Sequence, residues 1–197
     1  MKPIGKVSPG GDTFSFRFMG VPKIEKMNIY LVGFMGTGKT AVGKVLAKRK
    51  DWQFLDLDEL IELNEKMAIT DIFSKKGEPY FRKIETLALK QASGEKKFVV
   101  ACGGGIVINP DNIKIMKETG LIICLMSTAD VILKRTQGYT HRPLLNVLNP
   151  KKQIALLLKL RAPYYAKAHK CIDTSKLSVK EVVGEILKFS GSQKLRR

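Results

Sequence analysis

Residues 28–40 read NIYLVGFMGTGKT, and this stretch decides the fold. Its first part is a short apolar run typical of a buried strand, and Gly33–Thr40 matches the pattern GxxxxGK[ST] where that strand passes into a helix. Glycines let the backbone aim successive N–H groups at a phosphate, and the helix N-terminus adds partial positive charge. The alternative, a glycine-rich turn that merely contains a lysine, fits the flanking strand and helix poorly. The stretch therefore predicts a nucleotide-phosphate site in an α/β domain.

Outward from this loop, short apolar runs alternate with helical stretches, the pattern of an α/β domain with a mainly parallel sheet. The expected strands are 28–32, 53–56, 98–102, 121–125 and 170–173. The expected helices are 40–50, 58–66, 70–75, 79–92, 110–119, 128–136, about 151–167 and 179–189. Ligands of open α/β sheets bind beyond the carboxyl ends of the strands, so the two longest connections predict an acceptor-binding insertion at about 57–93 and a lid at about 137–150.

Composition and charge bound the class of protein. The chain has 197 residues, 44% of them hydrophobic, with 35 Lys plus Arg against 18 Asp plus Glu and a net charge of +17. This suits one domain with a real core at 28–189, flanked by a flexible basic extension at 1–27 and a basic tail at 190–197. No apolar run reaches the roughly 20 residues that a membrane span needs. The lysines are scattered over many expected helices, which favours a solvated surface over a specific nucleic-acid or membrane partner.

The number and spacing of the cysteines predict whether the protein works in a reducing or an oxidising compartment. Cys102, Cys124 and Cys171 are odd in number and widely spaced, so they predict neither a disulfide framework nor a CxxC metal clip. Buried thiols in a reducing compartment, the cytoplasm, are the expectation. We also expect a monomer.

Many P-loop proteins carry the carboxylate that supports the metal at the end of an apolar strand, and the natural candidate strand here lacks one. The strand at 98–102 ends in Gly103-Gly104-Gly105 without an acid, whereas the strand at 53–56 leads into Asp56-Leu57-Asp58. Two carboxylates on one face of an extended segment are costly unless a cation or a proton-accepting task justifies them. Asp56 is therefore expected in the Mg²⁺ shell and Asp58 on the acceptor hydroxyl. The alternative is that Asp58 caps the helix that follows.

The loop itself supplies the nucleotide ligands. Lys39 is expected to reach the β- and γ-phosphates of ATP, and the Thr40 hydroxyl to ligate Mg²⁺. The wider phosphate cradle is Gly36, Thr37, Gly38, Lys39, Thr40 and Ala41.

Three arginines and a glycine triplet suit an anionic acceptor. Arg82 lies in the insertion, Arg142 in the lid and Arg161 near the end of a helix. A guanidinium offers a planar fork that matches carboxylate or phosphate, although each arginine alone could be a surface charge. At Gly103–Gly105 the missing side chains allow a ligand to approach backbone N–H groups, and an ordinary tight turn is the alternative.

These motifs, in this order over 28–189, resemble the shikimate kinases, P-loop kinases related to adenylate kinase. The resemblance rests on the 33–40 loop, Asp56-Leu57-Asp58, Phe81-Arg82-Lys83-Ile84-Glu85, the glycine triplet, Arg142-Pro143-Leu144-Leu145 and Arg161-Ala162-Pro163-Tyr164-Tyr165. It implies a three-layer α/β/α domain with a five-stranded parallel sheet of order 2-3-1-4-5. It also implies ATP- and Mg²⁺-dependent phosphorylation of the 3-hydroxyl of shikimate in aromatic amino acid biosynthesis, giving ADP and shikimate 3-phosphate.

The same resemblance implies roles for individual residues. Arg142 is expected to meet the phosphates of ATP, and Lys39, Asp58 and Arg142 together to act in catalysis. Arg135 and the 173–176 segment are expected at the adenine, although some relatives carry arginine where Lys176 stands. Substrate contacts are expected from Asp58, Arg82, Gly103, Gly104, Gly105 and Arg161, with Arg82 and Arg161 on the carboxylate. The alternatives are a gluconate or nucleoside monophosphate kinase and, from another class, a nucleotide-regulated nucleic-acid-binding protein.

Overall fold

The sheet has the expected composition and order. The computed structural model describes residues 27–137 and 148–194. In these, parallel strands form a five-stranded sheet of order β2-β3-β1-β4-β5. Its strands are β1 (Asn28–Val32), β2 (Gln53–Asp56), β3 (Phe98–Ala101), β4 (Gly120–Met126) and β5 (Lys170–Asp173). The predicted fold class and strand order are confirmed. Arg142, most of the predicted lid and residues 1–26 lie outside the described residues.

Helices connect the strands in the predicted alternation. They are α1 (Lys39–Lys50), α2 (Leu57–Glu65), α3 (Ile69–Gly94), α4 (Pro110–Thr119), α5 (Ala129–Thr136), α6 (Pro150–Tyr165) and α7 (Val179–Lys194). Side-chain caps explain several starts: Asn109 caps α4, Thr128 caps α5 and Asn149 caps α6, with proline in the first turn of α4 and α6.

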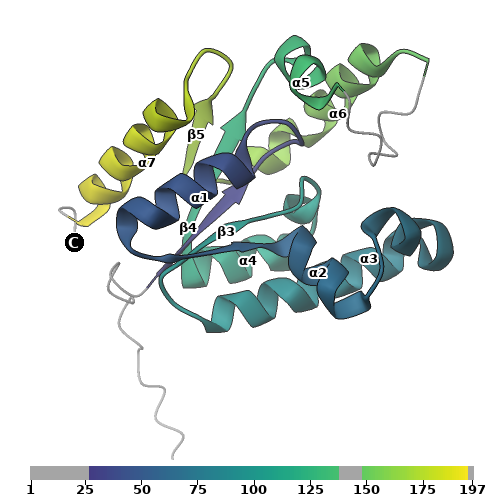
Figure 1. Cartoon of the computed structure of the whole chain (residues 1–197), viewed down its shortest axis with the longest axis horizontal. Helices are drawn as coiled ribbons and strands as arrows, with labels where there is room; N and C mark the ends of the chain where they lie inside the picture. The colour runs from purple at the N-terminus through teal and green to yellow at the C-terminus, as the bar shows by residue number, and fades with distance from the viewer. Residues whose placement is uncertain (1–26, 138–147, 195–197) are drawn as a thin grey trace, which may run out of the picture.

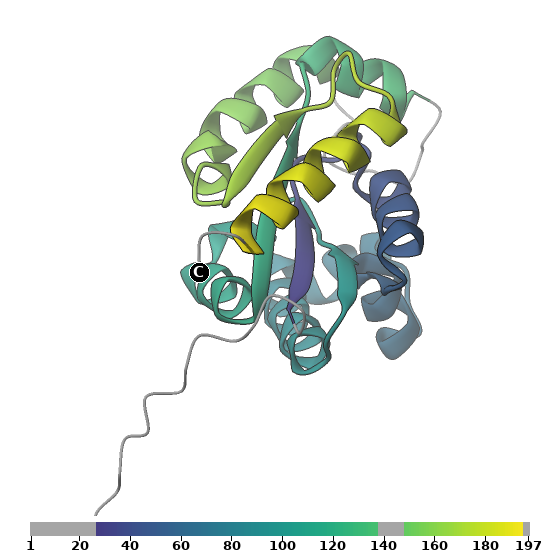
Figure 2. The same cartoon turned by 90° about the vertical axis from the view of Figure 1, so that its left-hand side faces the viewer.

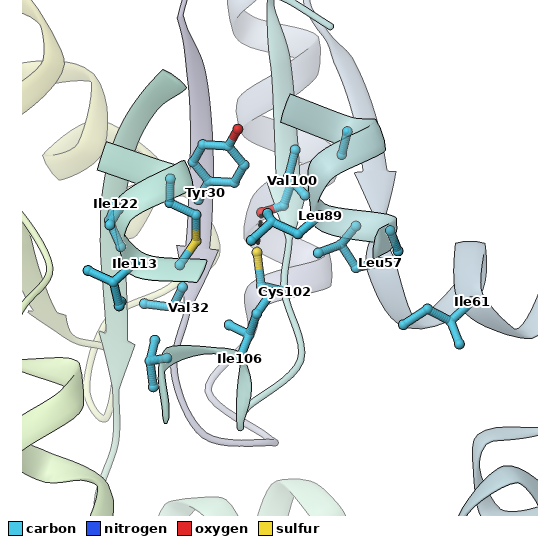
Figure 3. Close-up of a cluster of buried hydrophobic side chains, with 14 of the residues drawn as sticks. Tyr30, Val32, Leu57, Ile61, Leu89, Val100, Cys102, Ile106, Ile113 and Ile122 are labelled. Atoms are coloured by element: carbon cyan, nitrogen blue, oxygen red, sulfur yellow. Dashed lines mark hydrogen bonds between the residues drawn. The ribbon is translucent and has the colours of Figure 1, made fainter. Parts of the chain in front are cut away.

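Helices cover both faces of the sheet, as Figure 1 and Figure 2 show. Alternation along β1 explains this, because Ile29 and Leu31 point to one face while Tyr30 and Val32 point to the other. The first face packs against α1 and α7. The second, shown in Figure 3, packs mainly against α2, α3 and α4 around a core that includes Cys102. The result is the predicted three-layer α/β/α arrangement.

The insertion between β2 and β3 holds one long helix with a break. Three helices are expected between these strands, and α3 spans the last two of them, at 70–75 and 79–92. Gly77 separates its halves with φ 81° and ψ 167°, a conformation that only glycine adopts without strain. Pro79 follows at the start of the second half, where a missing N–H costs little. The two expected helices are therefore separated by a break in the backbone at Gly77.

Two elements differ from expectation. A short 3₁₀ helix, Ile106–Ile108, follows the glycine triplet, where no element was expected. Helix α7 continues past the expected end at Phe189 into the stretch assigned to a tail. Ser190, the first residue beyond the expected end, is buried, and its hydroxyl donates to Leu187 O within the helix.

Among the described residues, the three thiols are free, with Cys102 and Cys124 buried and Cys171 half-buried. No helix in the described part of the chain is long and apolar enough to cross a membrane.

Candidate active site

The P-loop is held in shape by its own side chains. Gly33, Gly36 and Gly38 all have positive φ, and Gly38 is the residue before α1. The Thr37 hydroxyl donates to Phe34 O at 2.7 Å, and Lys39 Nζ donates to Gly33 O and Phe34 O at 3.0 Å each. The loop thus arches back on itself and leaves its N–H groups at the amino end of α1, where an anion is favoured.

Thr40 and Asp56 come together as predicted. Thr40 Oγ1 donates to Asp56 Oδ2 at 2.9 Å, which joins the first turn of α1 to the end of β2. A hydroxyl and a carboxylate are hard oxygen donors of the kind that Mg²⁺ prefers. The pair is compatible with a Mg²⁺ site completed by phosphate oxygens and water.

The structure corrects the expected arrangement of Asp56 and Asp58. The cap of α2 is Asp56, whose Oδ1 accepts from Asp58 N at 3.1 Å. Asp58 itself lies in the first turn of α2, so the two carboxylates do not share one face of an extended segment. The alternative that Asp58 caps this helix is also wrong. Because Asp56 takes the capping bond, the Asp58 carboxylate is left to face the glycine triplet.

Each glycine of the triplet lies against a different charged side chain. A Cβ added at Gly103 would lie 2.6 Å from Glu85 Oε1 and 3.0 Å from Asp58 Oδ1. One added at Gly105 would lie 2.5 Å from Arg82 Nη2, and one at Gly104 would lie 3.5 Å from Arg161 Nη1. The triplet is therefore more than a tight turn. It brings α2, α3 and α6 together around one point at the carboxyl edge of the sheet.

Arg82 is held by two carboxylates. Its Nη1 donates to Glu85 Oε2 at 2.8 Å, and its Nε and Nη2 donate to Glu78 Oε1 at 3.1 and 2.9 Å. The Glu85 side chain is 1% exposed, and its Oε1 has no hydrogen-bond partner among the described residues. Burial raises the pKa of Glu85, and the neighbouring Arg82 guanidinium offsets part of that rise. Arg82 and Arg161 are thus formally balanced by Asp58 and Glu85, and Glu78 is a further carboxylate on Arg82.

The other side of the acceptor pocket is fixed by α6. The Arg161 guanidinium lies over the Phe34 ring at 5.4 Å from the centroid, so this arginine, which the sequence predicts at the substrate, touches the P-loop. One helical turn later, Tyr165 OH donates to Gly104 O at 2.7 Å. Tyr165 is buried, and burial raises its pKa to about 12, so it stays a neutral donor.

The expected adenine residues lie at the opposite end of the P-loop. Arg135, in the last turn of α5, donates from Nη2 to Thr174 O at 2.8 Å and from Nη1 to Gly36 O at 3.4 Å. Lys176 is exposed in the same loop after β5, and Ala41 is exposed in the first turn of α1. The structure thus gathers the predicted nucleotide residues that it describes on one side of the loop and the acceptor residues on the other.

Comparison with known proteins decides the family. A family model described as shikimate kinase matches residues 35–190. The chain belongs to the shikimate kinase family. The shikimate kinase of Thermodesulfovibrio yellowstonii is 48% identical over 161 residues, covering 82% of this chain and 93% of that protein. The one from Thermoanaerobacter pseudethanolicus is 44% identical, with 82% and 94% covered.

A solved structure, the shikimate kinase from Acinetobacter baumannii in complex with shikimate, matches with a TM-score of 0.83 and 39% identity. The match covers 87% of this chain and 97% of that one. The chain is thus a member of this family of ATP-dependent phosphotransferases, and the sheet order inferred from the resemblance to shikimate kinases is the observed one.

Two residues of the site, Glu85 and Tyr165, are not predicted by the sequence motifs. Glu85 lies in the segment that begins at Phe81, and its spacing of three from Arg82 on a helix places both on one face. Tyr165 gave no such signal, because its partner is a backbone carbonyl far away in sequence.

Proposed function

We propose that the chain transfers the γ-phosphoryl group of Mg²⁺-ATP to the 3-hydroxyl of shikimate, giving ADP and shikimate 3-phosphate. The observation that carries the proposal is the pocket of Asp58, Arg82 and Arg161 around the glycine triplet, directly beside a P-loop. A hydroxylated ring with a single carboxylate matches that set, since two guanidinium groups can bind the carboxylate and Asp58 can accept from a hydroxyl.

On the nucleotide side, the backbone N–H groups of Gly36 to Ala41 hold the phosphates. Lys39 exchanges its bonds to Gly33 O and Phe34 O for the β- and γ-phosphate oxygens. Thr40 and Asp56 would hold Mg²⁺. When bound, the ion neutralises phosphate charge and fixes the γ-phosphate for transfer. Arg135 and the loop containing Lys176 contact the adenine.

On the acceptor side, Arg82 and Arg161 bind the substrate carboxylate, and the N–H groups of Gly103, Gly104 and Gly105 line the sugar-like ring. Asp58 holds the 3-hydroxyl in line with the γ-phosphorus and accepts its proton as the new bond forms. A loose transition state needs little help from a base, so positioning is its larger contribution.

Arg142 is the proposed lid arginine, which adds positive charge at the transferring phosphoryl group. Groups of this kind are worth roughly 10³- to 10⁵-fold in rate in phosphoryl transfer. Arg142→Ala should therefore depress kcat far more than it weakens ATP binding, and near-unchanged turnover would remove Arg142 from the chemistry.

The assignment is tested with a coupled assay of ADP release using shikimate, gluconate and nucleoside monophosphates as acceptors. Shikimate-dependent release that requires Mg²⁺ is the expected result. Release with gluconate or a nucleoside monophosphate, and none with shikimate, would overturn the choice of acceptor. The free thiols of the described residues support the cytoplasm as the compartment, and a monomer stays a prediction.

A further inference from the structure

We propose that Thr174 is a positioning residue for the nucleotide: its hydroxyl fixes the outer side of the P-loop and the Arg135 guanidinium at the same time. The inference rests on the proposed function, in which the P-loop and Arg135 bind ATP. Thr174 follows β5, is 2% exposed and carries no charge that could contact the nucleotide itself.

Thr174 contacts three separate segments of the chain. Its Oγ1 lies 3.1 Å from Thr37 O in the P-loop, 3.0 Å from Met126 O at the end of β4, and 3.1 Å from Arg135 Nη1 in α5. Its backbone N–H also donates to Met126 O, at 2.8 Å. These partners are distant in sequence, so a single buried side chain joins the P-loop, the end of β4 and Arg135.

The hydrogen-bond capacities of these groups indicate which contact matters most. A threonine hydroxyl has one proton to donate and accepts at its oxygen. Arg135 Nη1 supplies a donor to that oxygen, while Met126 O already accepts from Thr174 N. Because Met126 O keeps its bond from Thr174 N without the hydroxyl, the contact that depends on the hydroxyl itself is the one to Thr37 O.

The preceding carbonyl of the loop, Gly36 O, is also hydrogen-bonded from outside the loop. Gly36 O accepts from Arg135 Nη1 at 3.4 Å, and Arg135 is itself held by Thr174 O at 2.8 Å. Thr174 thus acts on two consecutive carbonyls of the loop. It bonds Thr37 O directly, and it holds Arg135, which bonds Gly36 O. Because the N–H of a trans peptide points away from its C=O, holding Thr37 O outward directs the Gly38 N–H toward the phosphates, which is the preorganisation that anion binding needs.

The test replaces the hydroxyl with a methyl group of similar size. Thr174→Val should raise the KM for ATP and the Kd for Mg²⁺-ADP about tenfold, since a buried donor and acceptor lose their partner. The KM for shikimate should stay close to wild type. Thr174→Ser, which keeps the hydroxyl, should restore most of the nucleotide affinity.

A matched control is Thr119→Val, which removes a hydroxyl bonded to Tyr30 OH and Ile115 O at the opposite edge of the sheet. It should change thermal stability but not the KM for ATP. If Thr174→Val is folded and binds Mg²⁺-ADP like wild type, the inference is wrong. If it fails to fold, Thr174→Ser against Thr174→Ala decides, and equal nucleotide affinity in those two variants would overturn it.

A double-mutant cycle tests the link through Arg135. Thr174→Val combined with Arg135→Met should raise the Kd for Mg²⁺-ADP by less than the product of the two single effects, because the Thr174 hydroxyl and Arg135 are bonded to each other and hold adjacent carbonyls of the loop. Effects that multiply would mean that the two residues act independently. Wild-type protein that binds no Mg²⁺-ADP would instead refute the proposed function, so the two failures are distinguishable.

Discussion

The two halves of this active site are built in different ways. The nucleotide half is mostly backbone from one contiguous loop, with Lys39 and Thr40 next to the groups they assist. The acceptor half is side chains from α2, α3 and α6, brought together only where they meet the glycine triplet. The nucleotide half can tolerate change in distant helices, while the acceptor half depends on how the helices of the whole domain pack. Variants in each half should therefore differ in their effects.

Among the described residues, the largest effect is expected at Asp58. Asp58→Asn keeps the size of the side chain but removes the carboxylate that orients the 3-hydroxyl and accepts its proton, so kcat should fall by roughly 10²- to 10⁴-fold. Steady-state kinetics and the Kd for Mg²⁺-ADP are the measurements. Nucleotide affinity should be unchanged, and a variant with near-wild-type kcat would show that Asp58 has no role in the transfer.

Next in size is Gly105→Ala, which tests the packing of the acceptor half alone. The new methyl group would lie 2.5 Å from Arg82 Nη2, so the arginine must move away from its place. We expect the KM for shikimate to rise roughly ten- to hundredfold.

Its control is Gly184→Ala, at a position in α7 where an added methyl group meets nothing within 4 Å. That variant should keep wild-type kinetics and gain up to about 1 kcal/mol in stability, since alanine favours the helix more than glycine does. If both glycine variants had the same shikimate KM, the acceptor pocket would not depend on this contact.

The contrast between the halves also explains what could be read from the sequence. The P-loop, the strand order and the Thr40–Asp56 pair follow from short motifs and from a resemblance carried by several such motifs. The role of Asp56 as the cap of α2 did not follow, because Asp58 was an equally good capping residue. Glu85 and Tyr165 are not predicted as site residues because their contacts to Gly103 and to Gly104 O are set by helix packing.

A smaller effect is expected from Arg161→Lys, which keeps the charge but loses the planar fork and its contact with Phe34. The KM for shikimate should rise about tenfold while the KM for ATP stays near wild type. Isothermal titration with shikimate would check this directly. A parallel loss of nucleotide affinity would indicate that Arg161 also shapes the P-loop through Phe34.

The smallest effect concerns pH and Glu85. Because burial raises the pKa of Glu85 above its unfolded value, the folded state binds the proton more tightly, and the stability this contributes is lost as pH rises through the folded pKa. Glu85→Gln cannot titrate, so its Tm relative to wild type should rise by a few °C between pH 5 and pH 8. A difference in Tm that is constant with pH would contradict the raised pKa.

The position of β1 has a consequence for how the chain is made. This first strand lies at the centre of the sheet, and its neighbours are β3, in which Val99 pairs with Ile29, and β4, in which Leu121 does so. A ribosome therefore releases this buried strand long before either partner exists. Such non-local parallel pairing is slow to form and exposes hydrophobic surface meanwhile. We expect refolding in vitro to be slow and sensitive to protein concentration, and synthesis in the cell to benefit from chaperones.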